Sequence, residues 1–148
     1  MATLSESRVT LRFFGENLDP EELSALLGTT PTDSYKKGQV RVTTSGSEFT
    51  YKKGMWRLEA SDRKPANLAG QVSELLKVLP QSLELWRRLS SEYELDIFCG
   101  LFMEEGNEGF SLAPALMRDL ATRGITIDFD LYAPTLEEPH SAQVPGDA

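Results

Sequence analysis

The stretch RVTLRFFGENLDPEELSALLG, residues 8–28, predicts a strand and a helix in immediate succession. Apolar and polar residues alternate over residues 8–14, which is the period of a strand with one buried face. Asp19 is a favoured N-cap, Pro20 suits the first position of a helix, and Gly28 is a favoured C-terminal stop. The stretch therefore predicts a β-α unit.

A second stretch near the C-terminus is similar to the first. Residues 112–114 (Leu-Ala-Pro) follow a predicted strand, as residues 18–20 (Leu-Asp-Pro) do, and both predicted helices end at a glycine. An internal duplication would explain this similarity, and so would the general preference for proline in the first turn of a helix. The sequence leaves open whether the chain consists of two similar halves.

The elements between these two units complete an α+β fold. We expect a hairpin over residues 35–60, two helices over 65–91, a strand over 94–103 and a last strand over 125–132. The order β-α-β-β-α-α-β-α-β predicts a mostly antiparallel sheet with helices packed on one face. Alternation further predicts that Val40 and Val42 in the hairpin, and Phe129 and Leu131 in the last strand, face the core.

One domain accounts for most of the chain. A length of 148 residues fits a single domain with a substantial hydrophobic core. We expect this domain to cover residues 8–133, preceded by an N-terminal tail over residues 1–7. Residues 134–148 are rich in proline, glutamate and small polar residues, and we expect them to form a disordered C-terminal tail.

The composition argues against several classes of protein. The single cysteine, Cys99, rules out an internal disulfide, and neither a secretion signal nor a membrane-spanning apolar stretch is present, so we expect a cytoplasmic protein. A net charge of −8 and a pI near 4.7 argue against nucleic-acid binding. The only histidine, His140, lies in the predicted tail, and Cys99 lies on an apolar strand face, so the sequence predicts neither histidine-based catalysis nor a cofactor.

Two copies of one motif concentrate positive charge in this acidic chain. Residues 34–42 and 50–58 both read hydroxyl, Tyr-Lys-Lys-Gly, two residues, Arg, aliphatic, and residues 35–64 carry a net charge of +5. We expect Gly38 and Gly54 each to close a turn or form a bulge. Lysines beside turns protect sheet edges from aggregation, but they also contact acidic partners. The candidate binding residues are Tyr35, Lys36, Lys37, Tyr51, Lys52 and Lys53.

A second candidate site is acidic and consists of Asp96, Asp128 and Asp130. Alternation places these side chains on the polar face of two strands that we expect to be neighbours. Three carboxylates on one face could bind a hard cation such as Mg²⁺ or Ca²⁺, or perform acid/base chemistry. The same polar face receives Arg12, Arg41 and Arg57, so cross-strand ion pairs offer a simpler role for the aspartates.

Short motifs distributed along the chain carry a family resemblance: Phe14-Gly15, Leu18-Asp19-Pro20, Leu26-Leu27-Gly28, Thr30-Pro31-Thr32, Gly38, Trp56-Arg57-Leu58 and the run from Ile127 to Tyr132. With these motifs the chain resembles, over about residues 8–132, a widespread bacterial family, the domain of unknown function family numbered 4279. The resemblance implies a compact α+β domain and brings no established activity, cofactor or catalytic residue. The doubled Tyr-Lys-Lys-Gly motif does not belong to the family pattern.

Together these observations favour a non-enzymatic binding domain of the inhibitor or immunity type, an interpretation that rests on analogy with other small acidic α+β proteins. The expected partner is an acidic protein or a small anion. Basic and acidic patches on one chain also leave a symmetric homodimer open. The alternative function is a metal-dependent or acid/base hydrolase that uses Asp96, Asp128 and Asp130.

Overall fold

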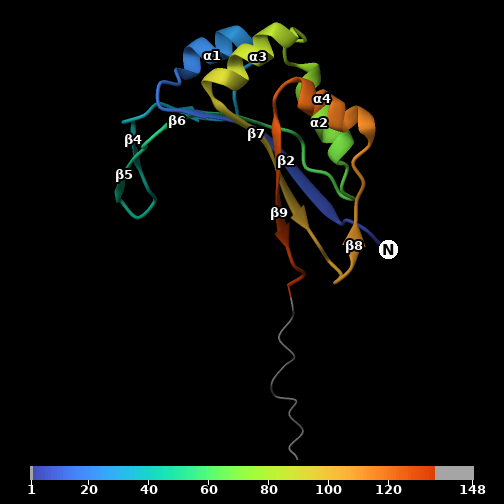
Figure 1. Cartoon of the computed structure of the whole chain (residues 1–148). Coiled ribbons are helices and arrows are strands. Elements are labelled where there is room, and N and C mark those ends of the chain that lie inside the picture. Colours follow the sequence, from blue (N-terminus) through green and yellow to red (C-terminus); the bar gives the residue numbers. More distant parts are fainter. Residues whose placement is uncertain (1, 136–148) are drawn as a thin grey trace, which may run out of the picture.

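A curved five-stranded sheet forms the centre of the protein, as seen in the computed structural model, which describes residues 2–135 (Figure 1). The strand order is β3-β6-β2-β7-β9, and only the β7–β9 pair is parallel. The helices lie along one side of this sheet, while the other side is left open. The predicted α+β class, with a mostly antiparallel sheet and helices on one face, is therefore confirmed.

The strand bounds are β2 Glu6–Gly15, β3 Asp33–Tyr35, β6 Gly54–Glu59, β7 Glu94–Phe102 and β9 Thr126–Tyr132. The alternation predicted for the first strand is present in β2, where Val9, Leu11 and Phe13 are buried on the helix side. β2 is the central strand because it pairs antiparallel with both β6 and β7. It therefore positions the side chains of the open face as well as those of the core.

The helices are α1 Pro20–Leu27, α2 Leu68–Lys77, α3 Leu83–Glu92 and α4 Pro114–Thr122. The predicted cap of α1 is confirmed, since the Asp19 side chain accepts hydrogen bonds from the backbone N–H groups of Glu21 and Glu22. α4 also begins with proline, but its N-cap residue Ala113 makes no side-chain cap bond. All four helices are too short to cross a membrane, among the residues that the structure describes.

The two β-α units are connected differently in space. β7 and β9 are direct parallel neighbours, whereas β6 lies between β2 and β3. The similarity between residues 18–20 and residues 112–114 therefore extends to the start of a helix but not to the pairing of the flanking strands.

Aromatic residues fill the core between the sheet and the helices. Phe13, Trp56 and Trp86 are fully buried, and the Phe13 ring packs edge-on to Trp56 with 5.5 Å between ring centroids. Each indole N–H has a hydrogen-bond acceptor, the Ser24 hydroxyl for Trp56 and the Pro80 carbonyl for Trp86. These bonds offset the cost of burying the polar edge of the indole.

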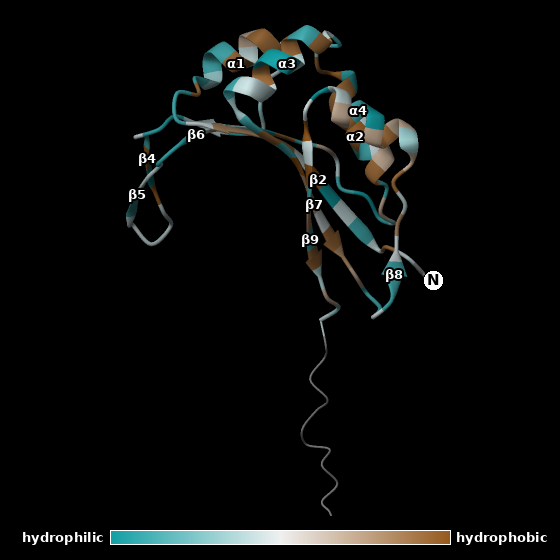
Figure 2. Ribbon diagram, viewed as in Figure 1, coloured by the Kyte–Doolittle hydropathy of each residue, from teal (hydrophilic) through white to brown (hydrophobic). Residues whose placement is uncertain are grey.

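A two-stranded hairpin, β4 Val40–Val42 and β5 Glu48–Thr50, projects from the sheet on the side opposite the helices (Figure 1). The prediction that Val40 and Val42 face the core was wrong, because their side chains are 50% and 63% exposed. The hairpin, drawn mostly in hydrophilic colours in Figure 2, leaves the sheet after β3 and returns to it only at β6. Alternation in β4 therefore separates two solvent-exposed faces.

The two motif glycines serve different purposes. Gly38 has a φ of 86° and closes a turn in which the Gln39 N–H donates to the Lys36 carbonyl, as expected. Gly54 instead starts β6 opposite Gly15, where an added Cβ would lie 2.8 Å from the Leu18 carbonyl oxygen. The expected turn or bulge at Gly54 is replaced by a close approach of two backbone segments.

The folded region extends further toward the N-terminus than the predicted tail over residues 1–7 allows. β1 Ala2–Thr3 pairs with β8 Glu108–Gly109, and Leu4 is buried in the core. The Glu108 carboxylate accepts hydrogen bonds from the Ser5 N–H and hydroxyl and from two backbone N–H groups of the adjacent turn. At the other end, all of the predicted disordered tail beyond residue 135 lies outside the described residues.

Candidate functional site

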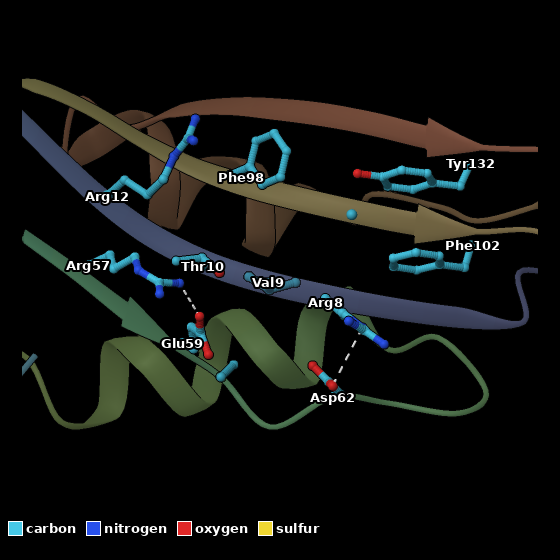
Figure 3. A pocket seen from close by; sticks show the side chains of 12 residues that line it. Arg8, Val9, Thr10, Arg12, Arg57, Glu59, Asp62, Phe98, Phe102 and Tyr132 are labelled. Carbon is cyan, nitrogen blue, oxygen red and sulfur yellow. Dashed lines mark hydrogen bonds and ion pairs between the residues drawn. The ribbon is translucent and has the colours of Figure 1, made fainter. Parts of the chain in front are cut away.

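The open face of the sheet presents arginine and aromatic side chains around a shallow hollow of about 390 Å³ (Figure 3). The hydrogen-bonded register brings alternate residues of β2, β6, β7 and β9 together on this face. The residues of the hollow that carry the argument below are Arg8, Arg12, Arg57, Phe98, Phe102 and Tyr132. We refer to these six as the open-face cluster.

Each side of the open-face cluster combines a cation with a ring. The Arg12 guanidinium lies 4.4 Å from the centroid of the Phe98 ring, and the Arg8 guanidinium lies 4.9 Å from that of Phe102. The rings of Phe102 and Tyr132 are nearly parallel, with centroids 4.6 Å apart, and Figure 3 shows them one beside the other at the end of β7 and β9. Stacking of this kind restricts the conformations of long side chains.

The three arginines of this cluster are also paired with carboxylates. Arg12 makes two hydrogen bonds to Asp96, of 2.9 and 2.6 Å, and this fork-like contact raises the pKa of Arg12. Arg57 pairs with Glu59, and Arg8 lies 3.5 Å from Asp62. The open face is therefore a mixed surface of paired charges and rings, with no excess of positive charge.

The three candidate aspartates lie on the open face as predicted, but they do not converge on one point. Asp96 is engaged by Arg12, and the Asp130 carboxylate accepts a 2.6 Å hydrogen bond from the Tyr132 hydroxyl. Asp128 lies beside Asp96, and the hydrogen bond and charge of Asp96 raise the pKa of Asp128. Within residues 2–135, acidic, histidine and cysteine side chains form no group of three that could hold a metal ion.

The two copies of Tyr-Lys-Lys-Gly meet in space through their tyrosines. The Tyr35 and Tyr51 rings stack with centroids 3.4 Å apart, Phe49 packs edge-on against Tyr51, and the Arg41 guanidinium lies 5.3 Å from the Tyr51 ring. Arg41 also bonds to Asp33 on the open face. We call Tyr35, Arg41, Phe49 and Tyr51 the hairpin cluster. It lies beside the open face, because Asp33 also approaches Arg57 at 3.9 Å.

The lysines of the Tyr-Lys-Lys-Gly motifs are not part of the hairpin cluster. Lys36 lies 3.4 Å from Asp19, Lys37 lies 3.6 Å from Glu16, and Lys53 lies 3.0 Å from Glu94. All three lysine side chains are about half exposed in these pairs. The fourth, Lys52, has an exposed side chain. The predicted set of six thus divides into two stacked tyrosines and four exposed lysines.

Nucleophilic chemistry finds little support among the described residues. Cys99 is fully buried, and burial raises the pKa of its thiol to about 12, so it remains protonated at neutral pH. This burial agrees with the predicted position of Cys99 on the apolar face of its strand. His140 lies outside the described residues.

Sequence reasoning missed the open-face cluster except for Arg12 and Arg57. The missed residues are Arg8, Phe98, Phe102 and Tyr132. A signal was present in β7, which places Phe98 and Phe102 on its polar face, whereas β9 contributes only Tyr132 at its end. Their proximity could not be foreseen because it depends on the β2–β7–β9 order.

The fold and this face define a small α+β domain whose sheet has one helix-covered side and one open side. The chain belongs to the family described as Domain of unknown function (DUF4279), whose model matches residues 5–134. The family resemblance noted in the sequence is therefore confirmed. Comparison with curated proteins and with solved structures gives no match.

Proposed function

We propose that this chain is a non-enzymatic binding domain of the inhibitor or immunity type, which recognises a partner protein with the open face of its sheet and the adjoining hairpin. The observation that carries the proposal is a set of three contacts between an arginine and an aromatic ring. These contacts are Arg8 on Phe102, Arg12 on Phe98 and Arg41 on Tyr51. Arginine, tyrosine and other aromatic residues are enriched in the energetically important centres of protein interfaces.

The exposed lysines support two kinds of partner, a protein with an acidic surface or a small anion. Exposed ion pairs such as Lys36–Asp19 and Lys37–Glu16 contribute little to stability because water screens them, so these lysines can exchange their partners at low cost. The lysines then add long-range attraction, and the stacked rings add contact area. The family resemblance and the single cysteine support a reducing bacterial cytoplasm as the place of action.

The experiment is capture of partners from a native lysate with the purified chain as bait, followed by mass spectrometry and measurement of affinity with the isolated partner. We expect a stoichiometric partner whose binding weakens as salt rises. Replacing the rings and cation of the surface, as in Arg12→Ala or Tyr51→Ala, should weaken binding by at least about tenfold.

A matched pair of charge variants tests the contribution of the lysines. The triple change of Lys36, Lys37 and Lys52 to glutamate should abolish capture, whereas the same change at Lys77, Arg87 and Arg118, which are exposed on the helical layer, should not. If both triple variants capture the partner as well as the unchanged chain does, then Lys36, Lys37 and Lys52 take no part in binding. If the Arg12→Ala variant captures the partner as well as the unchanged chain does, the open face is not part of the binding surface.

A hydrolase is a second proposal, because the Asp96–Asp128 pair borders another hollow of about 460 Å³ that also includes Arg12 and Tyr93. A general acid must carry a proton before it can donate one, and a raised pKa, as at Asp128, favours the protonated carboxyl group. Only Asp96 and Asp128 remain as candidate acid/base residues, because the Asp130 carboxylate accepts a hydrogen bond from the Tyr132 hydroxyl.

Two measurements distinguish this second proposal. Phosphatase and esterase assays should detect turnover that Asp128→Asn abolishes, and a metal-dependent version should show a rise in melting temperature with Mg²⁺ or Ca²⁺ that Asp128→Ala removes. Absence of turnover in both assays, together with a melting temperature that does not respond to these ions, would contradict the hydrolase.

A further inference from the structure

β9 is an edge strand whose outer backbone groups have no partner among residues 2–135. The Met103 N–H donates to the Tyr132 carbonyl, so even-numbered residues of β9 turn their backbone groups toward β7. The odd-numbered residues Ile127, Phe129 and Leu131 therefore turn their N–H and C=O groups outward. Such a row of free groups is a template for one more strand.

The helix-side surface of this edge is more apolar than an edge strand requires. Phe129 and Leu131 were expected in the core, yet they are 39% and 61% exposed, because the helical layer does not reach the end of β9. Phe110 and Met117 are also exposed, and the Phe110 ring lies 5.5 Å from that of Phe129. Phe110, Phe129 and Leu131 form an apolar patch along the edge, and exposed apolar patches are typical of contact surfaces.

The opposite surface of the same edge is acidic. Asp128 and Asp130 alternate with Phe129 and Leu131 along the strand. In an antiparallel addition, the outward-facing residues form the hydrogen-bonded pairs, and the aspartates occupy the non-hydrogen-bonded pairs, where opposite side chains come closest. Basic residues opposite the aspartates and apolar residues opposite Phe129 and Leu131 would complement both surfaces.

The same pattern argues against a second copy of this strand. In an antiparallel pair of two β9 strands centred on Phe129, each Asp128 lies opposite the Asp130 of the other copy. Like charges at directly opposite positions are destabilising. The edge is thus selective for a strand of a different composition.

We propose that β9 is a docking edge for an extended segment of another protein in which basic and apolar residues alternate, and that this segment adds to the sheet as an antiparallel sixth strand. Main-chain hydrogen bonds to Ile127, Phe129 and Leu131 hold the segment, and the alternating side chains select it. This edge adjoins the open face, since Tyr132 belongs to the open-face cluster and its hydroxyl donates to Asp130. The two proposals remain distinguishable, because strand addition depends on the outward backbone groups of β9, which the open-face proposal does not use.

The experiment uses the whole chain and a labelled synthetic peptide, about as long as β9, that alternates lysine and valine. Fluorescence anisotropy should show saturable binding at low salt, and hydrogen exchange of the Ile127, Phe129 and Leu131 amides should slow when the peptide is bound. A peptide that alternates glutamate and valine should not bind. A lysine–valine peptide with methylated backbone nitrogens should not bind either, although it keeps both charge and apolar surface.

A pair of protein variants locates the contact. The double change Asp128→Lys and Asp130→Lys should weaken peptide binding by at least about tenfold. The double change Glu21→Lys and Glu84→Lys, at exposed positions of α1 and α3, adds the same charge elsewhere and should leave the binding within about twofold of the unchanged chain. The melting temperature of each variant verifies that it is folded before the comparison is made.

Three results would overturn the proposal. Equal binding of the backbone-methylated peptide would show simple charge attraction without strand addition. Equal loss of binding in both double variants would show a general effect of net charge. A dimer seen by sedimentation, and lost only when Asp128 and Asp130 are changed, would make a second copy the occupant of this edge.

Discussion

Replacement of Phe13 by alanine should remove a large part of the protein's stability. The Phe13 side chain is fully buried in the central strand, and its ring contacts Trp56, Trp86 and Tyr93 with centroid distances of 5.5, 6.2 and 6.3 Å. Phe→Ala changes at such sites cost about 3–5 kcal/mol. Since whole domains are stable by only about 5–15 kcal/mol, the variant should be close to the limit of folding.

A comparison of three variants separates the causes of this loss. Phe13→Leu keeps most of the buried apolar volume but loses the ring contacts, which contribute about 0.5–1.5 kcal/mol each, so we expect a cost of about 1–3 kcal/mol. Phe49→Ala removes a half-exposed ring that packs edge-on against Tyr51 in the hairpin, and it should cost no more than about 1 kcal/mol. The expected order of cost is therefore Phe13→Ala, Phe13→Leu, Phe49→Ala.

Urea unfolding followed by tryptophan fluorescence measures these differences directly, because Trp56 and Trp86 are both buried against Phe13. A cost below about 1 kcal/mol for Phe13→Ala would refute the placement of this ring at the centre of the core. A cost for Phe49→Ala as large as that for Phe13→Leu would show that the hairpin is packed rather than projecting.

Two further predictions concern the motif glycines and one surface carboxylate. Gly54→Ala should cost about 1–3 kcal/mol because its Cβ meets the Leu18 carbonyl, and Gly54→Asn should be no better. Gly38→Ala meets nothing within 4 Å and should cost about 1–2 kcal/mol through its positive φ, a loss that Gly38→Asn partly recovers; urea unfolding that shows equal recovery at both sites would contradict this distinction. The hydrogen bonds that Glu108 accepts from Ser5 lower its pKa to about 2, so its stabilising effect is complete above the unfolded-state pKa near 4.5 and is lost as the pH falls toward 2. The difference in unfolding free energy between the unchanged chain and Glu108→Gln should shrink over that interval, and a difference independent of pH would show that Glu108 acts without its charge.

The parts of the fold that sequence predicts best are those fixed by neighbouring residues. The alternation in residues 8–14 and the Asp19–Pro20 helix start both appear as predicted, since each depends only on local backbone geometry. Alternation failed at the positions expected to face the core but found exposed, which are Val40, Val42, Phe129 and Leu131. Alternation shows which residues share a face of a strand, but whether that face is covered depends on where the helices end.

The candidate site also combines features that local patterns predict with features that depend on the strand order. The position of Asp96 and Asp128 on one face was predictable from their period, and so was their approach once the strands were assumed to be neighbours. Stacking of Tyr35 on Tyr51 was not predictable, because Tyr35 lies in β3, where its strand partner is Met55, and Tyr51 lies just after β5. The open-face cluster required the full strand order, which no local pattern contains.

The central position of β2 has a consequence for how the chain is made. This strand is synthesised early, yet its partners β6 and β7 are residues 54–59 and 94–102. The apolar side chains of Val9, Leu11 and Phe13 therefore lack one of the two neighbouring strands until residue 102 has left the ribosome. Sheets whose paired strands are far apart in the sequence fold slowly. During synthesis the unpaired β2 is therefore exposed for a time and can form incorrect contacts.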